Sequence, residues 1–404
     1  MMKCRICQHE ISPFMTYGRM PIANGFLVPE QYKDEYFFEL KPAFCDKCLT
    51  FQIEEQPDPE LMFHDQYAFF SRTSKFMQRH FKAYADWVYD NHLRGDDHFV
   101  VEIGSNDGIM LENFAKRGIR HLGVEPSANV AEEALKYGVN TIVEFFAPDC
   151  AECIVSEYGQ ADALLAANVM CHIPDLNGIA KGADILLKRD GVLIFEDPYL
   201  GAMIEKTSYD QIYDEHVFIF SAISVANIFG PHGFELIDLL PQETHGGSMR
   251  YVLARKGARS VAPSVAEIMA SEKVAGLHLP ETYEAFRESC EASKARLVRL
   301  LEAEKKAGRR VVGYGATSKS TTILNYCGIG PALIEFISDT TPIKQGKYTP
   351  GMHIPVKPYE EFAANYPDTA LLLAWNHQKE IMEKEKAFSA QGGKWISPIP
   401  ESDQ

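Results

Sequence analysis

Two Cys-x2-Cys pairs near the start of the chain constrain its fold more than any other feature. Cys4 and Cys7 form the first pair, and Cys45 and Cys48 form the second. Each pair brings two thiolates to one side of a turn, and two such turns complete a tetrahedral site of the kind that holds structural zinc. Because four sulfur ligands leave no position for water, we expect the metal to stabilise the fold and to take no part in chemistry. Four incidental cysteines are the alternative, and the double spacing disfavours it.

Size and composition narrow the class of protein. A chain of 404 residues is too long for one ordinary core, so two or three domains are expected. The formal net charge of -16 argues against a nucleic-acid partner, which needs a basic face. No apolar run of membrane-spanning length and no secretory signal is apparent, so we expect no membrane partner. Nine cysteines, an odd number, favour metal thiolates in a reducing cytoplasm over a disulfide framework.

The order of predicted elements gives an α/β fold with three parts. Residues 1–65 lack helical periodicity and form the zinc-binding module. Residues 66–258 begin with a helical lead-in and continue as alternating strands and helices, which predicts a doubly wound, Rossmann-like parallel sheet. A late strand near residues 249–254 is expected at the sheet edge. Residues 259–404 begin with a helical connector, including a long charged helix after Pro280, and end in a smaller α/β unit of the same type.

The turn after the first strand of the central domain predicts a nucleoside cofactor. Gly104 and Gly108 let the backbone turn tightly and approach a ligand, and Asn106 lies between them. The third glycine of a dinucleotide loop is missing, and the acid Glu102 closes the strand instead. This pattern favours a positively charged, phosphate-free cofactor, S-adenosylmethionine (SAM), over NAD. A dehydrogenase or kinase-like domain is the alternative.

Three further residues are predicted to contact this cofactor. Glu125 ends the second strand, where an acid accepts hydrogen bonds from both ribose hydroxyls. Phe145 is expected to place its ring against the adenine. Asn168 follows a later strand, where the sulfonium end of SAM is expected.

Two histidine clusters beyond this turn are candidates for chemistry. His172 follows a strand at its carboxyl end, where α/β enzymes form their sites. Tyr213, Glu215 and His216 lie in a polar and aromatic stretch. A histidine is the natural base near neutral pH, and a neighbouring carboxylate orients it. Taken alone, this cluster is more often structural, but a glycine turn that contains His245 and Ser248 favours a pocket.

Taken together, these motifs resemble the SAM-dependent C-methyltransferases that act on nucleotide-linked 4-ketosugars in deoxysugar biosynthesis. The resemblance covers nearly the whole chain. It is carried by both cysteine pairs, the stretch Asp65–Ser71, the turn from Glu102 to Gly108, and the motifs at residues 170–173, 213–216, 245–250 and 313–319.

The resemblance implies a mechanism and roles for these residues. A proton leaves the carbon next to the sugar's C4 ketone (C3), and the enolate takes the methyl group of SAM. His216 is then the base, held by Glu215, while Tyr213, His172 and Tyr67 line the sugar. We expect His245 and Ser248 to contact the substrate as well.

The turn that opens the C-terminal unit suits the substrate's diphosphate. Tyr314 and Gly315 end a strand, the next helix offers N–H donors, and Lys319 supplies a cation. A glycine turn that serves packing alone is the alternative for this motif.

Two other functions stay open on the sequence. One is an O- or N-methyltransferase for another small metabolite, and the other is a non-catalytic zinc scaffold with a dead methyltransferase core. The sequence also leaves open whether the chain is a monomer or an oligomer, and which sugar and nucleotide it takes.

Overall fold

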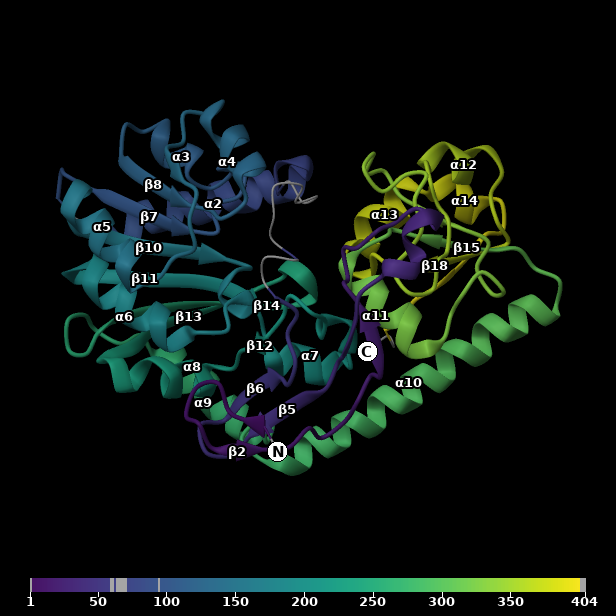
Figure 1. Cartoon of the computed structure of the whole chain (residues 1–404), viewed down its shortest axis with the longest axis horizontal. Coiled ribbons are helices and arrows are strands. Elements are labelled where there is room, and N and C mark those ends of the chain that lie inside the picture. The colour runs from purple at the N-terminus through teal and green to yellow at the C-terminus, as the bar shows by residue number, and fades with distance from the viewer. Residues whose placement is uncertain (1, 59–61, 63–70, 94, 400–404) are drawn as a thin grey trace.

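A computed structural model describes residues 2–58, 62, 71–93 and 95–399. It places two α/β units side by side, and the long helix α10 (Pro280–Lys306) runs from beside the N-terminal strands to beneath the C-terminal unit (Figure 1). The N-terminal strands lie along α10 between the two units. The predicted α/β class, with a zinc-binding module and two sheets of mainly parallel strands, is confirmed. The predicted domain boundaries at residues 65 and 258 stay a prediction.

The N-terminal module is built from short antiparallel strands. They are β1 (Met2–Lys3), β2 (Glu10–Ile11), β3 (Arg19–Pro21), β4 (Phe37–Glu39), β5 (Pro42–Cys45) and β6 (Thr50–Ile53), with the 3-10 helix η1 (Pro29–Asp34). β6 pairs on its other side with β12 (Phe218–Ile219), so Phe51 lies opposite Ile219. The module is therefore joined by a sheet to the segment that directly follows His216.

The central unit is a seven-stranded sheet in the order β13-β14-β11-β10-β7-β8-β9. Its strands are β7 (Phe99–Ile103), β8 (Arg120–Val124), β9 (Thr141–Ile142), β10 (Ala161–Ala167), β11 (Leu187–Pro198), β13 (Phe234–Gln242) and β14 (Ser248–Arg255). β7 to β11 are parallel, whereas β14 runs antiparallel to both β11 and β13. The expected edge position of β14 is therefore wrong, because β13, which the sequence analysis did not identify, lies outside it.

Helices and short helical turns connect these strands. They are η2 (Ser71–Thr73), α2 (Lys75–His92), α3 (Glu112–Ala115), α4 (Ala128–Leu135), α5 (Pro148–Tyr158), η3 (Met170–His172), α6 (Leu176–Leu186), α7 (Leu200–Lys206), η4 (Tyr209–Gln211), α8 (Ala222–Phe229), η5 (Gly230–His232) and η6 (Thr244–Gly246). α2 begins where Ser74 accepts a hydrogen bond from the Met77 N–H, and it buries Phe81, Tyr84 and Val88 at helical spacing. No helix in the described part of the chain is long and apolar enough to cross a membrane.

The C-terminal unit follows α9 (Pro263–Val274) and α10. Its five strands are all parallel, in the order β17-β16-β15-β18-β19. They are β15 (Val311–Tyr314), β16 (Ile337–Ser338), β17 (Val356–Lys357), β18 (Thr369–Leu372) and β19 (Lys394–Ile396), with α11 (Ser318–Cys327), α12 (Tyr359–Ala364), η7 (Trp375–His377), α13 (Gln378–Lys384) and α14 (Lys386–Ala390).

One hydrophobic cluster joins all three parts. Tyr17 of the N-terminal module lies between Tyr209 and Tyr326, with ring centroids 6.2 and 4.8 Å away. Phe44 stacks on Tyr283 of α10 at 4.1 Å. Buried aromatic contacts of this kind fix the two α/β units against each other, which positions the site between them.

Candidate active site and zinc site

The four predicted zinc ligands converge. The donor atoms of Cys4, Cys7, Cys45 and Cys48 all lie within 4.8 Å of one another, and none of the four forms a disulfide. The Sγ atoms of Cys4 and Cys48 are 3.5 Å apart, and those of Cys7 and Cys45 are 3.6 Å apart. Zinc–sulfur bonds of about 2.3 Å in a tetrahedron require sulfur atoms roughly 3.8 Å apart. The cluster therefore fits a structural zinc ion.

Both cysteine turns have the same backbone geometry. The residue after the second cysteine, Gln8 or Leu49, has a positive φ of 60° or 59°. Its N–H donates to the carbonyl of the first cysteine of the pair, at 3.0 Å in one turn and 2.7 Å in the other. In addition, Gln52 Nε2 donates to Cys4 Sγ at 3.1 Å, an outer contact that orients a metal ligand.

A cavity of about 1140 Å³ lies between the two α/β units. It is large enough for two ligands of cofactor size. Many of the predicted residues line it: Gly104, Asn106, Glu125, Phe145, Asn168, His172, Tyr213, Glu215, His216, His245 and Lys319. Tyr67, also predicted here, lies outside the described residues.

The cofactor end of the cavity is formed by the carboxyl ends of β7 and β8. Gly104 has a φ of +64°, and a Cβ there would lie 2.4 Å from Val169, so only glycine fits. Glu125 is buried, which raises its pKa, and its carboxylate accepts hydrogen bonds from the N–H groups of Asn106 and Ser127. At the far side, Asn168 Oδ1 is buried without a partner among the described residues. An acid and a close-approach glycine at one side, with an unpaired acceptor at the far side, suit the ribose hydroxyls and the cationic end of SAM.

Glu102 in β7 and Gly108 in the turn after it, both predicted to contact the cofactor, do not line the cavity. Glu102 is only 3% exposed, and burial raises its pKa well above its usual value. Gly108 has a φ of +70°, and a Cβ there would lie 2.9 Å from Val139. We therefore assign Gly108 to packing against α4 and no longer place either residue in contact with the cofactor.

The histidine cluster lies at the centre of the cavity. Nε2 of His216 lies 3.0 Å from the Tyr213 hydroxyl, and its Nδ1 lies 2.7 Å from the carbonyl oxygen of Gln211. The rings of His172 and His216 are stacked, with centroids 5.3 Å apart. Burial lowers the pKa of His216 well below its usual value and that of His172 to about 4, so both rings are neutral at neutral pH.

Glu215 does not hold His216, contrary to the prediction. Its carboxylate accepts a hydrogen bond from Asn24 Nδ2 at 2.7 Å, and burial raises its pKa to about 7. The carbonyl of Gln211 takes the orienting role instead. A backbone carbonyl leaves no side-chain signal, so the residue pattern could not reveal this contact.

The predicted substrate residues divide into two groups. His245 and Lys319 line the cavity, and Lys319 Nζ donates to the carbonyl oxygen of His245 at 2.9 Å. Ser248 and Tyr314 are buried away from it: Ser248 Oγ donates to the Thr244 carbonyl and the Tyr314 hydroxyl donates to Glu385. Gly315 has a φ of +90°, and a Cβ there would lie 2.7 Å from Ala374. We therefore withdraw Ser248, Tyr314 and Gly315 as substrate contacts.

Lys344 is a site residue that the sequence analysis missed. It lines the cavity, and its Nζ donates to the carbonyl oxygen of Ala316, two residues before the start of α11. The lysine lies in a polar loop after β16 that carries no recognisable motif. Its proximity to α11 arises only from the parallel pairing of β15 and β16.

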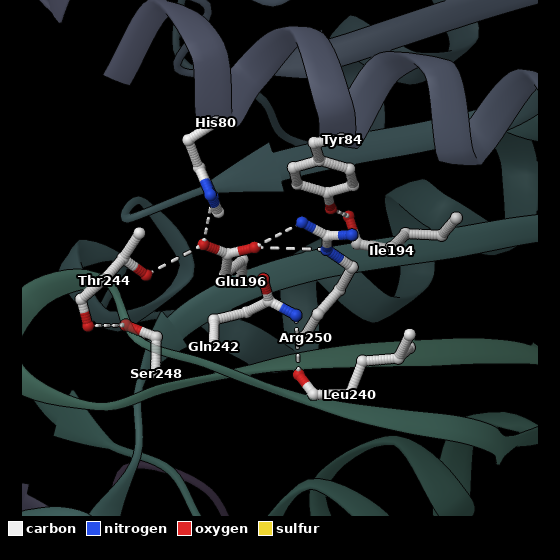
Figure 2. A network of polar contacts seen from close by, with 9 residues as sticks. All are labelled: His80, Tyr84, Ile194, Glu196, Leu240, Gln242, Thr244, Ser248 and Arg250. Atoms are coloured by element: carbon white, nitrogen blue, oxygen red, sulfur yellow. Dashed lines mark hydrogen bonds and ion pairs between the residues drawn. The ribbon is translucent and has the colours of Figure 1, made fainter. Parts of the chain in front are cut away.

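A buried network around Glu196 fixes one wall of the cavity (Figure 2). One carboxylate oxygen accepts from His80 Nε2 at 2.7 Å and from Thr244 Oγ1 at 3.1 Å, and the other accepts from Arg250. Burial opposes ionisation of Glu196, but the hydrogen bond from His80 and the charge of Arg250 outweigh it and lower the pKa. The network joins α2, which lines the cavity through Phe76 and Met77, to β11 and to the turn of His245.

Comparisons with known proteins match three consecutive parts of the chain to family models. Residues 4–63 match a putative zinc binding domain, residues 73–239 a methyltransferase domain, and residues 243–400 a C-methyltransferase C-terminal domain. The magnesium protoporphyrin IX methyltransferase of Synechocystis PCC 6803, solved with bound SAH, resembles part of the chain at 17% identity and a TM-score of 0.35. That match covers 44% of this chain and 83% of that one.

Two curated relatives differ in how much of the chain they match. A ubiquinone biosynthesis O-methyltransferase of Acinetobacter baylyi is 29% identical over 27% of this chain and 48% of its own. The C-methyltransferase NovU of Streptomyces niveus is 34% identical over 99% of this chain and 96% of its own. Since this second match runs through the zinc site, the cofactor turn and the C-terminal unit, the chain belongs to the family of SAM-dependent C-methyltransferases.

Proposed function

We propose that this enzyme methylates C3, the carbon next to the C4 ketone, of a nucleotide-linked 4-keto-deoxysugar, in the biosynthesis of a branched deoxysugar. The observation that carries the proposal is the geometry of His216. A carbonyl oxygen only accepts hydrogen bonds, so Nδ1, 2.7 Å from Gln211 O, carries the proton. Nε2 is then the basic nitrogen of a neutral ring at the cavity wall.

The first step is removal of a proton from C3. Nε2 of His216 accepts this proton, and the C–H electron pair forms the enolate with charge on the C4 oxygen. Without substrate, the Tyr213 hydroxyl donates to Nε2 of His216. When the sugar is bound, the same O–H turns to the C4 oxygen and donates to it as charge develops. SAM, when bound, supplies the methyl group. As the enolate carbon forms its new C–C bond, the methyl–sulfur bond would break, which restores the ketone and leaves S-adenosylhomocysteine as the second product.

His172 has a separate role in this scheme. Its ring is neutral because burial lowers its pKa to about 4, and it lies against His216. A neutral neighbour supports a neutral base, whereas a charged ring would repel the proton that the base must accept. We assign His172 to the wall that encloses the sugar.

The nucleotide diphosphate is assigned to the start of α11. Thr317 caps this helix, its side chain accepting a hydrogen bond from Ser320 N, and the helix start lines the cavity at Thr317, Ser318 and Lys319. Anions bind at such helix ends, and Lys319 and Lys344 add two cations at the same wall. Lys319 has two further N–H donors beyond the one given to His245.

The experiment is incubation of the zinc-loaded protein with labelled SAM and a panel of nucleotide-linked sugars, with and without a C4 ketone. We expect label only in 4-ketosugars, in a bond that resists acid, with the ketone retained. Acid-labile label, or equal labelling of sugars without a ketone, would show that the enolate mechanism is wrong.

A further inference from the structure

Three residues of the segment before His216 contact the C-terminal unit through their side chains or carbonyl groups. The Tyr209 hydroxyl lies 3.5 Å from Cys327 Sγ, Asp210 Oδ2 accepts from Trp375 Nε1 at 2.6 Å, and the Ile212 carbonyl accepts from Thr322 Oγ1 at 2.9 Å. Cys327 and Thr322 belong to α11, and Trp375 begins η7. The backbone that leads to the histidine is therefore held by side chains from the other unit.

Gln211 connects this segment to the ring of His216. Its carbonyl accepts the Nδ1 proton of His216, and its side-chain amide donates to the carbonyl oxygen of His245. The same His245 oxygen accepts from Lys319 Nζ at 2.9 Å. One oxygen atom thus joins the segment of His216, the turn of His245 and the first turn of α11.

Trp375 makes the most specific of these contacts. Its indole N–H can only donate, and it donates to a carboxylate that is fully buried. The ring also lies on the turn of His245, because a Cβ at Gly246 would come within 2.3 Å of it. Trp375 does not itself line the cavity, unlike its neighbours Asn376 and His377.

We propose that Trp375, acting through Asp210, is a positioning residue for His216, so that the C-terminal unit takes part in the proton step as well as in substrate binding. The inference rests on the proposed function, which makes His216 the base. Without the indole N–H, the buried Asp210 carboxylate loses a hydrogen bond and has to move. Gln211 follows Asp210 directly in η4, so its carbonyl shifts away from Nδ1.

The test compares two tryptophan variants of the full-length, zinc-loaded enzyme. Trp375→Phe removes the N–H and keeps an aromatic ring. Trp395→Phe is the matched control, because Trp395 belongs to the same unit and its Nε1 donates to the exposed Ser389. We expect Trp375→Phe to lower kcat by roughly 10- to 100-fold, with the KM for SAM within about twofold of normal, and Trp395→Phe to leave both values unchanged.

A second measurement isolates the proton step. In D2O, with SAH in place of SAM, the base exchanges the proton at C3 of a 4-ketosugar for deuterium without methyl transfer. We expect Trp375→Phe to slow this exchange by the same factor as kcat. A loss confined to the KM for either substrate, or normal exchange, would overturn the proposal.

Asp210→Asn covers the case in which Trp375→Phe does not fold, since it keeps the size of the side chain and one acceptor oxygen. The weaker acceptor should also lower kcat, and the double variant should be no slower than the slower single variant. Unchanged turnover in Asp210→Asn, or strictly additive losses, would contradict the coupling. His216→Ala distinguishes failure of the proposed function from failure of the positioning role. Normal turnover in His216→Ala would show that His216 is not the base. An inactive His216→Ala together with a normal Trp375→Phe would show only that Trp375 does not position the base.

Discussion

Nδ1 of His216 lies 2.7 Å from the carbonyl oxygen of Gln211, and this contact determines which nitrogen of the ring can act as a base. The proton stays on Nδ1 and the lone pair on Nε2, beside the Tyr213 hydroxyl. A backbone carbonyl cannot take up the positive charge that a carboxylate would balance. In the proposed mechanism the imidazolium is therefore stabilised by the enolate of the substrate, which ties the proton transfer to the presence of the ketone.

Replacement of His216 should separate binding from chemistry. We expect His216→Ala to bind SAM with an unchanged binding enthalpy. The rate of methyl transfer should fall by about 100- to 10,000-fold, the usual contribution of a general base. His121→Ala, at a histidine of β8 whose ring bonds to the carbonyl of Ile119, is the control. Near-normal turnover in His216→Ala, measured with labelled SAM, would remove His216 as the base.

The pH dependence of kcat/KM should reflect the burial of His216. A base works only when unprotonated, so its activity is present above its pKa and lost as the pH falls through that value. Since burial lowers this pKa well below its ordinary value of about 6.5, we expect no histidine inflection at 6.5 in the free enzyme. An inflection near pH 7 would belong to Glu215, and the Glu215→Gln variant should abolish it. A step at 6.5 that persists in that variant would contradict the assignment.

Zinc should be required for folding and not for the reaction itself. We expect metal analysis to find about one zinc per chain, and Cys45→Ser to lower both the zinc content and the unfolding temperature. Cys153→Ser, at an exposed cysteine of α5, should change neither. A zinc-free protein that keeps its unfolding temperature would show that the four cysteines serve another purpose.

The cofactor turn offers a matched pair of glycines. Gly104 and Gly138 both have positive φ, but a Cβ at Gly104 would clash with Val169 whereas nothing lies within 4 Å of a Cβ at Gly138. We expect Gly104→Ala to weaken SAM binding strongly, because the backbone must shift at the cavity wall. Gly138→Ala carries only the backbone strain, of about 1–2 kcal/mol. Calorimetric titration with SAM distinguishes them, and equal affinities would contradict the steric argument.

The Glu196 network should dominate the stability of the cavity wall. Glu196→Gln leaves the Arg250 guanidinium buried without its counter-charge, which costs about 3–5 kcal/mol. Glu302→Gln, at an exposed position of α10, should change stability by less than about 0.5 kcal/mol. Urea unfolding at neutral pH measures both, and a loss below about 1 kcal/mol in Glu196→Gln would show that Arg250 finds another partner.

The parts of the fold and site that were predictable from the sequence depend on short-range patterns. The cysteine pairs, the strand–turn–helix around Gly104, and α10 follow from spacing, turn residues and periodicity, and the structure contains all three. The edge position of β14 was wrong because strand order depends on long-range pairing, and the outer strand β13 has no clear alternation of its own.

The roles within the site were harder to predict for the same reason. Glu215 lies next to His216 in sequence, yet its carboxylate turns to Asn24, which is 191 residues away. Tyr314 lies at a strand end where ligands often bind, but its hydroxyl donates a hydrogen bond to Glu385. The sequence around Lys344 does not indicate a site residue, because the lysine reaches the cavity only through the pairing of β15 with β16. Tertiary contacts of this kind are invisible to spacing and periodicity.

The pairing of β12 with β6 limits how the chain can be divided. A shortened chain that begins at residue 73, where the methyltransferase domain match starts, would lack β6 and leave Phe218 and Ile219 as an uncovered strand edge. Exposed apolar edges pair with other chains and aggregate. We therefore expect the methyltransferase domain to aggregate when it is produced alone, so the N-terminal module should be expressed and engineered together with it.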